Sequence, residues 1–202
     1  MLSEERPLSR DERFITWLIG LAEDGQERSG KNSAKNRAIL AALRRGLGKT
    51  PGGVLEMYPH LMQFLKPTEE QLLENFALIA SLFAMHPDKG GKGNLGSTLA
   101  EVRKAAELSG AGASSIERRF VALLNAHRED LPKHLRQVIS LAKSRDVSID
   151  WLQLLHDIRY WNNPDRIVQR RWAREFWAGF EPSSEDANGD GNPVNEEEEN
   201  AL

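Results

Sequence analysis

The regular spacing of apolar residues in residues 130–177 is the feature that most constrains how this chain can fold. Apolar side chains return every three or four positions, which places them on one arc of a helix and leaves the opposite arc polar. Pro132 and Pro164 suit the first turn of a helix, and Ser148 and Asn163 are expected to cap two helix starts. The spacing therefore predicts three short helices with a shared buried face. Their predicted core residues are Leu135, Val138, Ile139, Ala142, Trp151, Leu154, Leu155 and Ile158.

The same period runs through the rest of the chain, whereas alternation with a period of two residues is rare. Ser9 and Glu12 form a predicted capping box for the first helix, and residues 23–36 lack apolar periodicity and are expected to form a loop. Further helices are expected over residues 37–47, 55–65, 68–86, 98–108 and 114–127. Ser114 is expected to cap the last of these, with His127 on its buried face. The prediction is an all-α protein whose helices pack as bundles.

Two stretches of unusual composition divide the chain. Residues 87–97 are rich in glycine and predict a flexible boundary between two halves. Residues 181–202 hold eight acidic residues and no lysine or arginine, a composition that cannot bury a core. The predicted organisation is an N-terminal helical bundle over residues 1–95, a C-terminal helical bundle over residues 96–180, and an acidic disordered tail over residues 181–202.

The charge balance and the absence of cysteine narrow the classes of function. The net charge of −3 conceals an excess of positive charge, because the 27 basic residues face only 22 acidic ones outside residues 181–202, a balance of +5. Such an asymmetry favours a polyanionic partner. Without cysteine the chain can form no disulfide and no thiolate metal site. No apolar run approaches the ~18 residues that cross a membrane, so a cytoplasmic protein without a membrane partner is expected.

Three short motifs resemble known functional sites, and for each a structural or chance interpretation is favoured. Gly48-Lys49-Thr50 ends like a phosphate-binding P-loop, but it follows a predicted helix, so we interpret it as a helix end with Lys49 as a plain cation. His86-Pro87-Asp88 matches the tripeptide of J-domain co-chaperones, but the preceding helix carries no lysine or arginine. The residues between Asp186 and Glu197 match the ligand pattern of a calcium-binding loop, but their composition favours a disordered tail.

No catalytic constellation is visible in the sequence. The five histidines are scattered without metal-ligand spacing, and no nucleophile motif is present. We therefore expect no catalytic residue, no metal and no cofactor, and an enzyme is not the favoured interpretation.

Arginine and lysine gather on the polar arcs of the predicted helices. One interpretation is a solvated charged surface, which any helical bundle carries. The other is a nucleic-acid-binding surface, because the planar guanidinium fork matches phosphate oxygens and stacks on bases. The clustered residues are Arg37, Arg44, Arg45, Lys133, Arg136, Lys143, Arg166, Arg170, Arg174 and Trp177.

Four segments carry a resemblance to a known family. They read, in order, AILAALRRGLGKTPG, SSIERRFVALLNAHREDLPKHLRQVISLAKS, VSIDWLQLLHDIRYW and VQRRWAREFW. Over about residues 9–180 the chain resembles CasB, the small subunit of the type I-E CRISPR Cascade surveillance complex. The resemblance implies an all-helical, two-bundle subunit without catalytic activity. It also implies two copies per complex, in contact with other Cascade subunits, CRISPR RNA and target DNA, where they help hold the displaced strand of the R-loop.

The resemblance also suggests which residues meet nucleic acid. The arginines of ALRRG, IERRF, HLRQ and VQRRWAR match its motifs, and two lysines lie in the same segments. The candidate nucleic-acid-binding residues are Arg44, Arg45, Lys49, Arg118, Arg119, Arg136, Lys143, Arg170, Arg171 and Arg174.

The main alternative is a helical protein-interaction or scaffold module, of the co-chaperone kind, whose arginines meet acidic protein surfaces. A metal-dependent nuclease is a third class.

Overall fold

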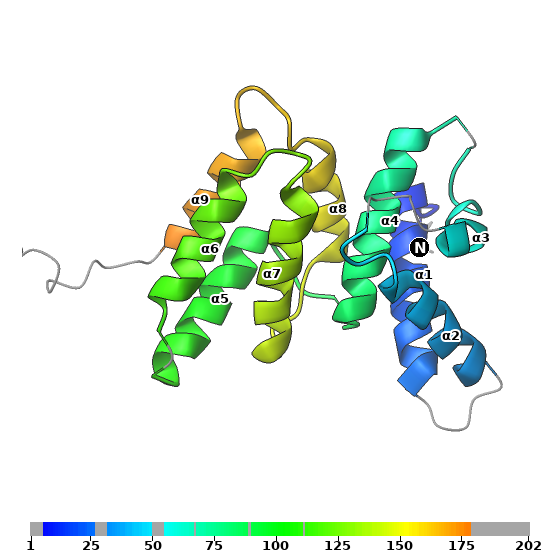
Figure 1. Ribbon diagram of the computed structural model, residues 1–202, viewed down its shortest axis with the longest axis horizontal. Coiled ribbons are helices and arrows are strands. Elements are labelled where there is room, and N and C mark those ends of the chain that lie inside the picture. Colours follow the sequence, from blue (N-terminus) through cyan, green and yellow to red (C-terminus); the bar gives the residue numbers. More distant parts are fainter. Residues whose placement is uncertain are drawn as a thin grey trace, which may run out of the picture.

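The computed structural model describes residues 6–26, 32–49, 55–66, 68–88, 90–110 and 112–178. Within these ranges every regular element is a helix, which confirms the predicted all-α fold (Figure 1). The predicted acidic tail and its calcium-loop-like stretch lie outside the described residues. The elements are α1 (Arg10–Gln26), α2 (Ser33–Arg44), the 3₁₀ turn η1 (Leu55–Met57), α3 (Tyr58–Leu61), α4 (Glu70–Met85), α5 (Leu95–Leu108), α6 (Ser114–Leu124), α7 (Leu131–Ser144), α8 (Trp151–Arg159) and α9 (Ile167–Trp177).

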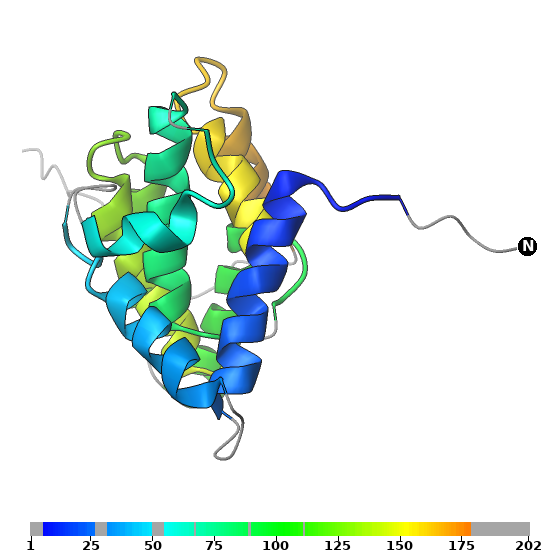
Figure 2. The same ribbon diagram turned by 90° about the vertical axis from the view of Figure 1, so that its right-hand side faces the viewer.

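Two groups of helices lie side by side, α1 to α4 in one and α5 to α9 in the other (Figure 1). They meet where α8 packs against α4 and α1, and Figure 2 shows α1 alongside α8. One cluster of buried side chains continues through both groups. The predicted division into domains 1–95 and 96–180 stays a prediction, which thermal unfolding in one or two separate transitions would test.

Helix α4 is the centre of the packing because it has almost no polar face. Residues 76–84 are all buried, and a helix that is apolar all round has to be covered on all sides. Helices α2, α7 and α8 provide that cover. Phe83 meets Trp151 edge to face with ring centroids 5.4 Å apart, and truncating a buried phenylalanine typically costs about 3–5 kcal/mol. Through α4, the end of α2 is held at a fixed place relative to α7.

The start of the first helix confirms its predicted capping box. The backbone N–H of Glu12 donates to Ser9 Oγ at 3.3 Å, and the N–H of Ser9 donates to a carboxylate oxygen of Glu12 at 2.7 Å. The predicted loop over residues 23–36 is wrong in extent, since α1 continues to Gln26 and α2 begins at Ser33. Apolar periodicity did not detect the first turn of α2 because the side chains buried there, Ser33 and Asn36, are polar.

Helix α5 begins earlier than the predicted residue 98 and packs unusually closely on α9. Asn94 caps it at Leu95, with its side-chain oxygen accepting the backbone N–H of Gly96 at 2.8 Å. A Cβ on Gly96 would lie 2.1 Å from the carbonyl oxygen of Trp172. The absence of a side chain at this position is therefore what allows the backbones of α5 and α9 to approach.

Three predicted helix starts are wrong, those of α8, α9 and α6. Asp150, rather than Ser148, caps α8, and its carboxylate accepts a first-turn N–H at 2.9 Å. Helix α9 begins at Ile167, since Asn163 instead closes a turn by accepting the N–H two residues on at 2.9 Å. Ser114 lies within the first turn of α6 and makes no capping bond.

The predicted burial of His127 is also wrong. Helix α6 ends at Leu124, three residues earlier, and the side chain of His127 is exposed. The chain has left the helix before this position, so the helical period that predicted an inward side chain no longer applies.

The tripeptide His86-Pro87-Asp88 has a structural role in this fold. The side chains of His86 and Asp88 are only 8% and 10% exposed. His86 Nε2 lies 2.9 Å from the carbonyl oxygen of Val147, and Asp88 accepts hydrogen bonds from Trp151 Nε1 at 2.8 Å and from the N–H of Ile149 at 3.1 Å. The tripeptide thus ties the α4–α5 connection to the α7–α8 connection, with both polar side chains turned inward.

Candidate nucleic-acid interface

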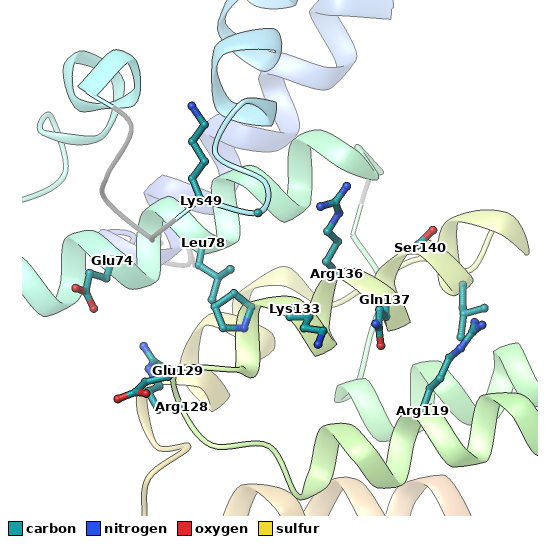
Figure 3. A pocket seen from close by; sticks show the side chains of 13 residues that line it. Lys49, Glu74, Leu78, Arg119, Arg128, Glu129, Lys133, Arg136, Gln137 and Ser140 are labelled. Carbon is teal, nitrogen blue, oxygen red and sulfur yellow. The ribbon is translucent and has the colours of Figure 1, made fainter.

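A groove of about 960 Å³ opens between the turn after α2, helix α4, one side of α7 and one side of α6 (Figure 3). Side chains from all four elements line it, and basic groups predominate among its charged residues. The lining residues are Gly48, Lys49, Glu74, Leu78, Arg119, Arg128, Glu129, Pro132, Lys133, Arg136, Gln137, Ser140 and Leu141.

One wall of the groove is the polar stripe of α7. Lys133, Arg136, Gln137 and Ser140 follow one another at helical spacing and are all exposed. They face outward because Leu135 and its apolar neighbours one turn on are buried against the core. At a rise of 1.5 Å per residue, the stripe from Lys133 to Ser140 extends over about 10 Å along the helix. The stripe is therefore a row of hydrogen-bond donors and cations rather than a single charged point.

The opposite wall is the turn that ends α2. Helix α2 ends at Arg44, and the chain turns through Gly48, whose φ of 77° lies in the left-handed region that favours glycine. This agrees with the interpretation of that motif as a helix end, although Thr50 lies outside the described residues. A Cβ on Gly48 would lie 3.2 Å from Arg136 Nη1. Figure 3 shows Arg136 extending from α7 toward the turn that carries Lys49.

The acidic residues lie toward one end of the groove. Figure 3 shows Glu74 and Glu129 near Arg128, away from Ser140. Arg128 uses its guanidinium group for hydrogen bonds within the protein. It donates to the carbonyl oxygen of Ile158 at 2.6 Å and to the side chain of Asn75. Burial lowers the pKa of Arg128 from its ordinary value, which the charge of Glu74 partly opposes.

The central part of the groove carries cations without a carboxylate partner. Among the described residues, Lys49, Arg119, Lys133 and Arg136 form no ion pair. All four side chains are exposed. The structure therefore brings together three predicted site residues, Lys49, Arg119 and Arg136, which come from three different segments of the sequence.

Two more predicted residues lie at the C-terminal end of α4. Arg44 Nε donates to the carbonyl oxygen of Ala84 at 2.8 Å, and Lys143 Nζ donates to that of Met85 at 2.7 Å. Cations at this position satisfy the last carbonyl groups of α4 and complement its dipole. Arg44 and Lys143 therefore stabilise a helix end while remaining exposed.

The other predicted site residues do not line the groove. Arg45 forms an exposed ion pair with Glu56 at 2.5 Å. Arg118, Arg170 and Arg174 are exposed on α6 and α9 and form no ion pair within the described residues. All four residues are outside the groove lining.

Arg171 and Trp177 are parts of the packed structure. Arg171 pairs with Asp157 of α8, which is 1% exposed. Asp157 also accepts a hydrogen bond from Trp172 Nε1 at 2.6 Å, and burial raises the pKa of this carboxyl group against the effect of its donors. Trp177, predicted to lie beside the basic stripe, packs on Phe120 with ring centroids 5.5 Å apart.

The list of candidate site residues did not include Lys133, Arg128, Gln137 or Ser140. Lys133 had been grouped with Arg136 on one basic arc of the predicted helix, and that shared arc was a usable signal for it. Gln137 and Ser140 become part of the groove only because α7 faces the end of α2 across α4, and no local pattern of the sequence contains that information.

The described residues contain neither a metal-binding cluster nor a membrane-spanning helix. No three histidine, aspartate or glutamate side chains among them come together as a group that could hold a metal ion. None of the helices described is both long enough and apolar enough to span a membrane.

The described residues define an all-helical protein with a cationic groove. A family model for the CRISPR-associated protein Cse2 matches residues 39–177. The Cse2 protein of Thermus thermophilus is 36% identical over 172 residues, which cover 84% of this chain and 91% of that protein. The chain therefore belongs to the CRISPR-associated Cse2 family.

Solved structures agree with this assignment. The crystal structure of CasB from Thermus thermophilus matches with a TM-score of 0.66 and 32% identity, covering 84% of this chain and 99% of that one. A chain from a CRISPR RNA-guided surveillance complex matches with a TM-score of 0.64 and 25% identity, covering 83% of this chain and 91% of that one. The resemblance to CasB inferred from the sequence is confirmed.

Proposed function

We propose that this chain is a non-catalytic, nucleic-acid-binding subunit of a CRISPR RNA-guided surveillance complex. In that complex it stabilises the R-loop between guide RNA and target DNA and holds the displaced DNA strand. It acts in the cytoplasm, together with the other Cascade subunits and as two copies per complex. The observation that carries the proposal is the groove, which Lys49, Arg119, Lys133 and Arg136 line without a carboxylate partner in the part of the chain that the structure describes.

The chemistry of the groove suits a sugar–phosphate backbone. Lysine ammonium groups bind phosphate as point charges, and arginine adds a fork that contacts two phosphate oxygens at once. Gln137 and Ser140 continue the same stripe with neutral hydrogen-bonding groups. Such contacts carry no sequence information. This fits a complex in which pairing between guide and target reads the sequence and protein contacts stabilise the strands.

The co-chaperone alternative has no support in the geometry. The only sequence feature in its favour was the tripeptide at His86, and there both polar side chains are buried and bonded to the α7–α8 connection. A partner protein could reach His86 and Asp88 only after that connection had opened.

The proposal is tested by measuring how binding of a fluorescent single-stranded DNA oligonucleotide depends on salt. Four cations without carboxylate partners predict a plot of log K against log salt concentration with a slope of about −2 to −3, at ~0.7 per phosphate neutralised. The chain should also co-purify with a short RNA when it is expressed with its cognate subunits. Binding that does not change between 50 and 300 mM salt would contradict a phosphate-binding groove.

A further inference from the structure

The described chain ends close to the groove. After α9 the last described residue is Ala178, and the side chain before it, Trp177, packs on Phe120 of α6. Phe120 faces inward, whereas its neighbour Arg119 is exposed and lines the groove. Helix α6 is about 10–12 Å across with its side chains. The point from which residues 179–202 continue is therefore about one helix diameter from Arg119.

The segment that continues from this point is acidic, whereas basic residues predominate among the charged residues of the groove. Residues 181–202 hold eight carboxylates and no lysine or arginine. Glu181 is three residues after Ala178 in the sequence. The run Glu196–Glu199 begins 18 residues after Ala178. At 3.3–3.6 Å per residue, 18 residues span at most about 60–65 Å. The acidic run therefore has the length to reach the groove from Ala178.

We propose that the acidic segment 181–202 binds in the basic groove when nucleic acid is absent and competes there with the phosphate backbone. The inference rests on the proposed function, because the competing ligand is the nucleic acid bound in that groove. The groove is favoured over Arg170 and Arg174 on α9 because it is concave and gathers four cations without carboxylate partners. A concave surface of one charge sign concentrates its potential. The segment limits binding to stray nucleic acid and is displaced by the strand of an assembled complex.

The affinity test compares the full chain with a variant of the same length and no tail charge. In that variant every Glu and Asp of residues 181–202 becomes Gln or Asn. A tethered competitor acts at an effective concentration on the order of millimolar, so we expect the neutral variant to bind single-stranded DNA about 3- to 10-fold more tightly at 50 mM salt. At 300 mM salt the difference should shrink toward 1, because both interactions are screened. Equal affinities at 50 mM salt would overturn the inference.

A crosslinking experiment tests the same inference without nucleic acid. A carbodiimide joins carboxylates to lysines on contact, and the groove offers Lys49 and Lys133. We expect mass spectrometry of the free protein to find Glu196–Glu199 joined to these two lysines, and the products to disappear when an oligonucleotide is added. Lys104 is the matched control, because it is exposed on α5, the helix that packs against α9, but does not line the groove.

The outcomes separate this inference from the proposed function. Crosslinks to Lys104 alone, or none in the groove, would overturn the tail–groove contact even if DNA binding is strong. If neither the parent nor the neutral variant binds DNA, the proposed function fails, and crosslinks to Lys49 and Lys133 still decide whether the tail occupies the groove.

Discussion

The arginines of this protein have different roles in two regions. One is the groove beside α7, and the other is the set of ion pairs that join α8 to α1 and α9, here called the seam. In the seam, Arg159 donates to both carboxylate oxygens of Asp11 at 2.6 and 2.7 Å, and Arg171 pairs with the buried Asp157. In the groove, Arg119 and Arg136 have no carboxylate partner among the described residues. The same residue type joins helices in one region and is available to a ligand in the other.

This difference separates structural charge from functional charge. A paired charge in a packed seam cannot be removed without leaving its partner uncompensated, so its loss is costly to stability. An exposed cation without a partner contributes little to stability, and its removal should mainly lower the affinity for the ligand that contacts it. The comparison predicts a ranking of stability effects, with seam substitutions first and groove substitutions last.

The largest effect is expected for Asp157→Ala. The substitution leaves the buried Trp172 Nε1 without its acceptor at 2.6 Å and leaves Arg171 without its carboxylate. Loss of one partner from a buried network of this kind costs about 3–5 kcal/mol. Chemical denaturation, followed by circular dichroism, would measure the change in the free energy of unfolding.

Asp157→Asn is the matched control for that experiment. Asparagine keeps one oxygen that can accept the hydrogen bond of Trp172, so we expect a smaller loss than for alanine. Equal stability of Asp157→Ala and the parent would show that the Asp157 network does not hold α8 to α9.

The second effect concerns backbone packing in the C-terminal group of helices. Gly96→Ala places a Cβ against the carbonyl of Trp172, which the 2.1 Å separation does not permit without a shift of α5 against α9. Overpacking of this kind costs about 1–3 kcal/mol. Gly20→Ala on α1 is the control, because no atom lies within 4 Å of its Cβ. Since alanine is the better helix former by ~1 kcal/mol, the control should be neutral or stabilising, and equal thermal midpoints for the two variants would contradict the packing argument.

The third effect is a pH dependence at the other side of the seam. Burial alone would raise the pKa of Asp11, but the hydrogen bonds and charge of Arg159 outweigh it and hold that pKa below its ordinary value of 3.8. A carboxyl group whose folded pKa is lowered contributes stability above its unfolded pKa and loses it as the pH falls through the folded value. Asp11→Asn should therefore cost about 1–2 kcal/mol at pH 7.

Denaturation curves at several pH values test the sign of this effect. The difference in unfolding free energy between the parent and Asp11→Asn should shrink as the pH falls below 4. A difference that continues to grow below pH 4 would mean that Asp11 is not held in its charged form by Arg159.

The sequence predicted the buried faces well because burial leaves a periodic signal. Leu135, Val138 and Ile139 are buried as their spacing indicates, and the capping box at Ser9 and Glu12 is confirmed. The error at the start of α8 occurs where two polar side chains could accept the same backbone donors. Local pattern could not show that Asp150, and not Ser148, would cap α8.

The roles of individual arginines were harder to predict because they are set by tertiary contacts. Arg170 and Arg171 are adjacent in the sequence, yet Arg170 is exposed and Arg171 reaches back to Asp157 on the preceding helix. Three of the groove residues, Lys49, Arg119 and Arg136, were predicted as site residues from motif resemblance. That they lie together depends on how α4 places the end of α2 opposite α7.

The smallest effect on stability, and the largest expected on binding, is predicted for the groove. Lys133→Gln with Arg136→Gln should change the free energy of unfolding by no more than about 0.5 kcal/mol, because both side chains are exposed and without carboxylate partners. The slope of log K against log salt for single-stranded DNA should become shallower by ~1.4, at ~0.7 for each lost phosphate contact. Arg170→Gln with Arg174→Gln removes the same charge from α9, outside the groove, and is the matched control. If the two double variants lower the slope equally, net charge rather than the geometry of the groove governs binding, and the contrast between the seam and the groove would not extend to function.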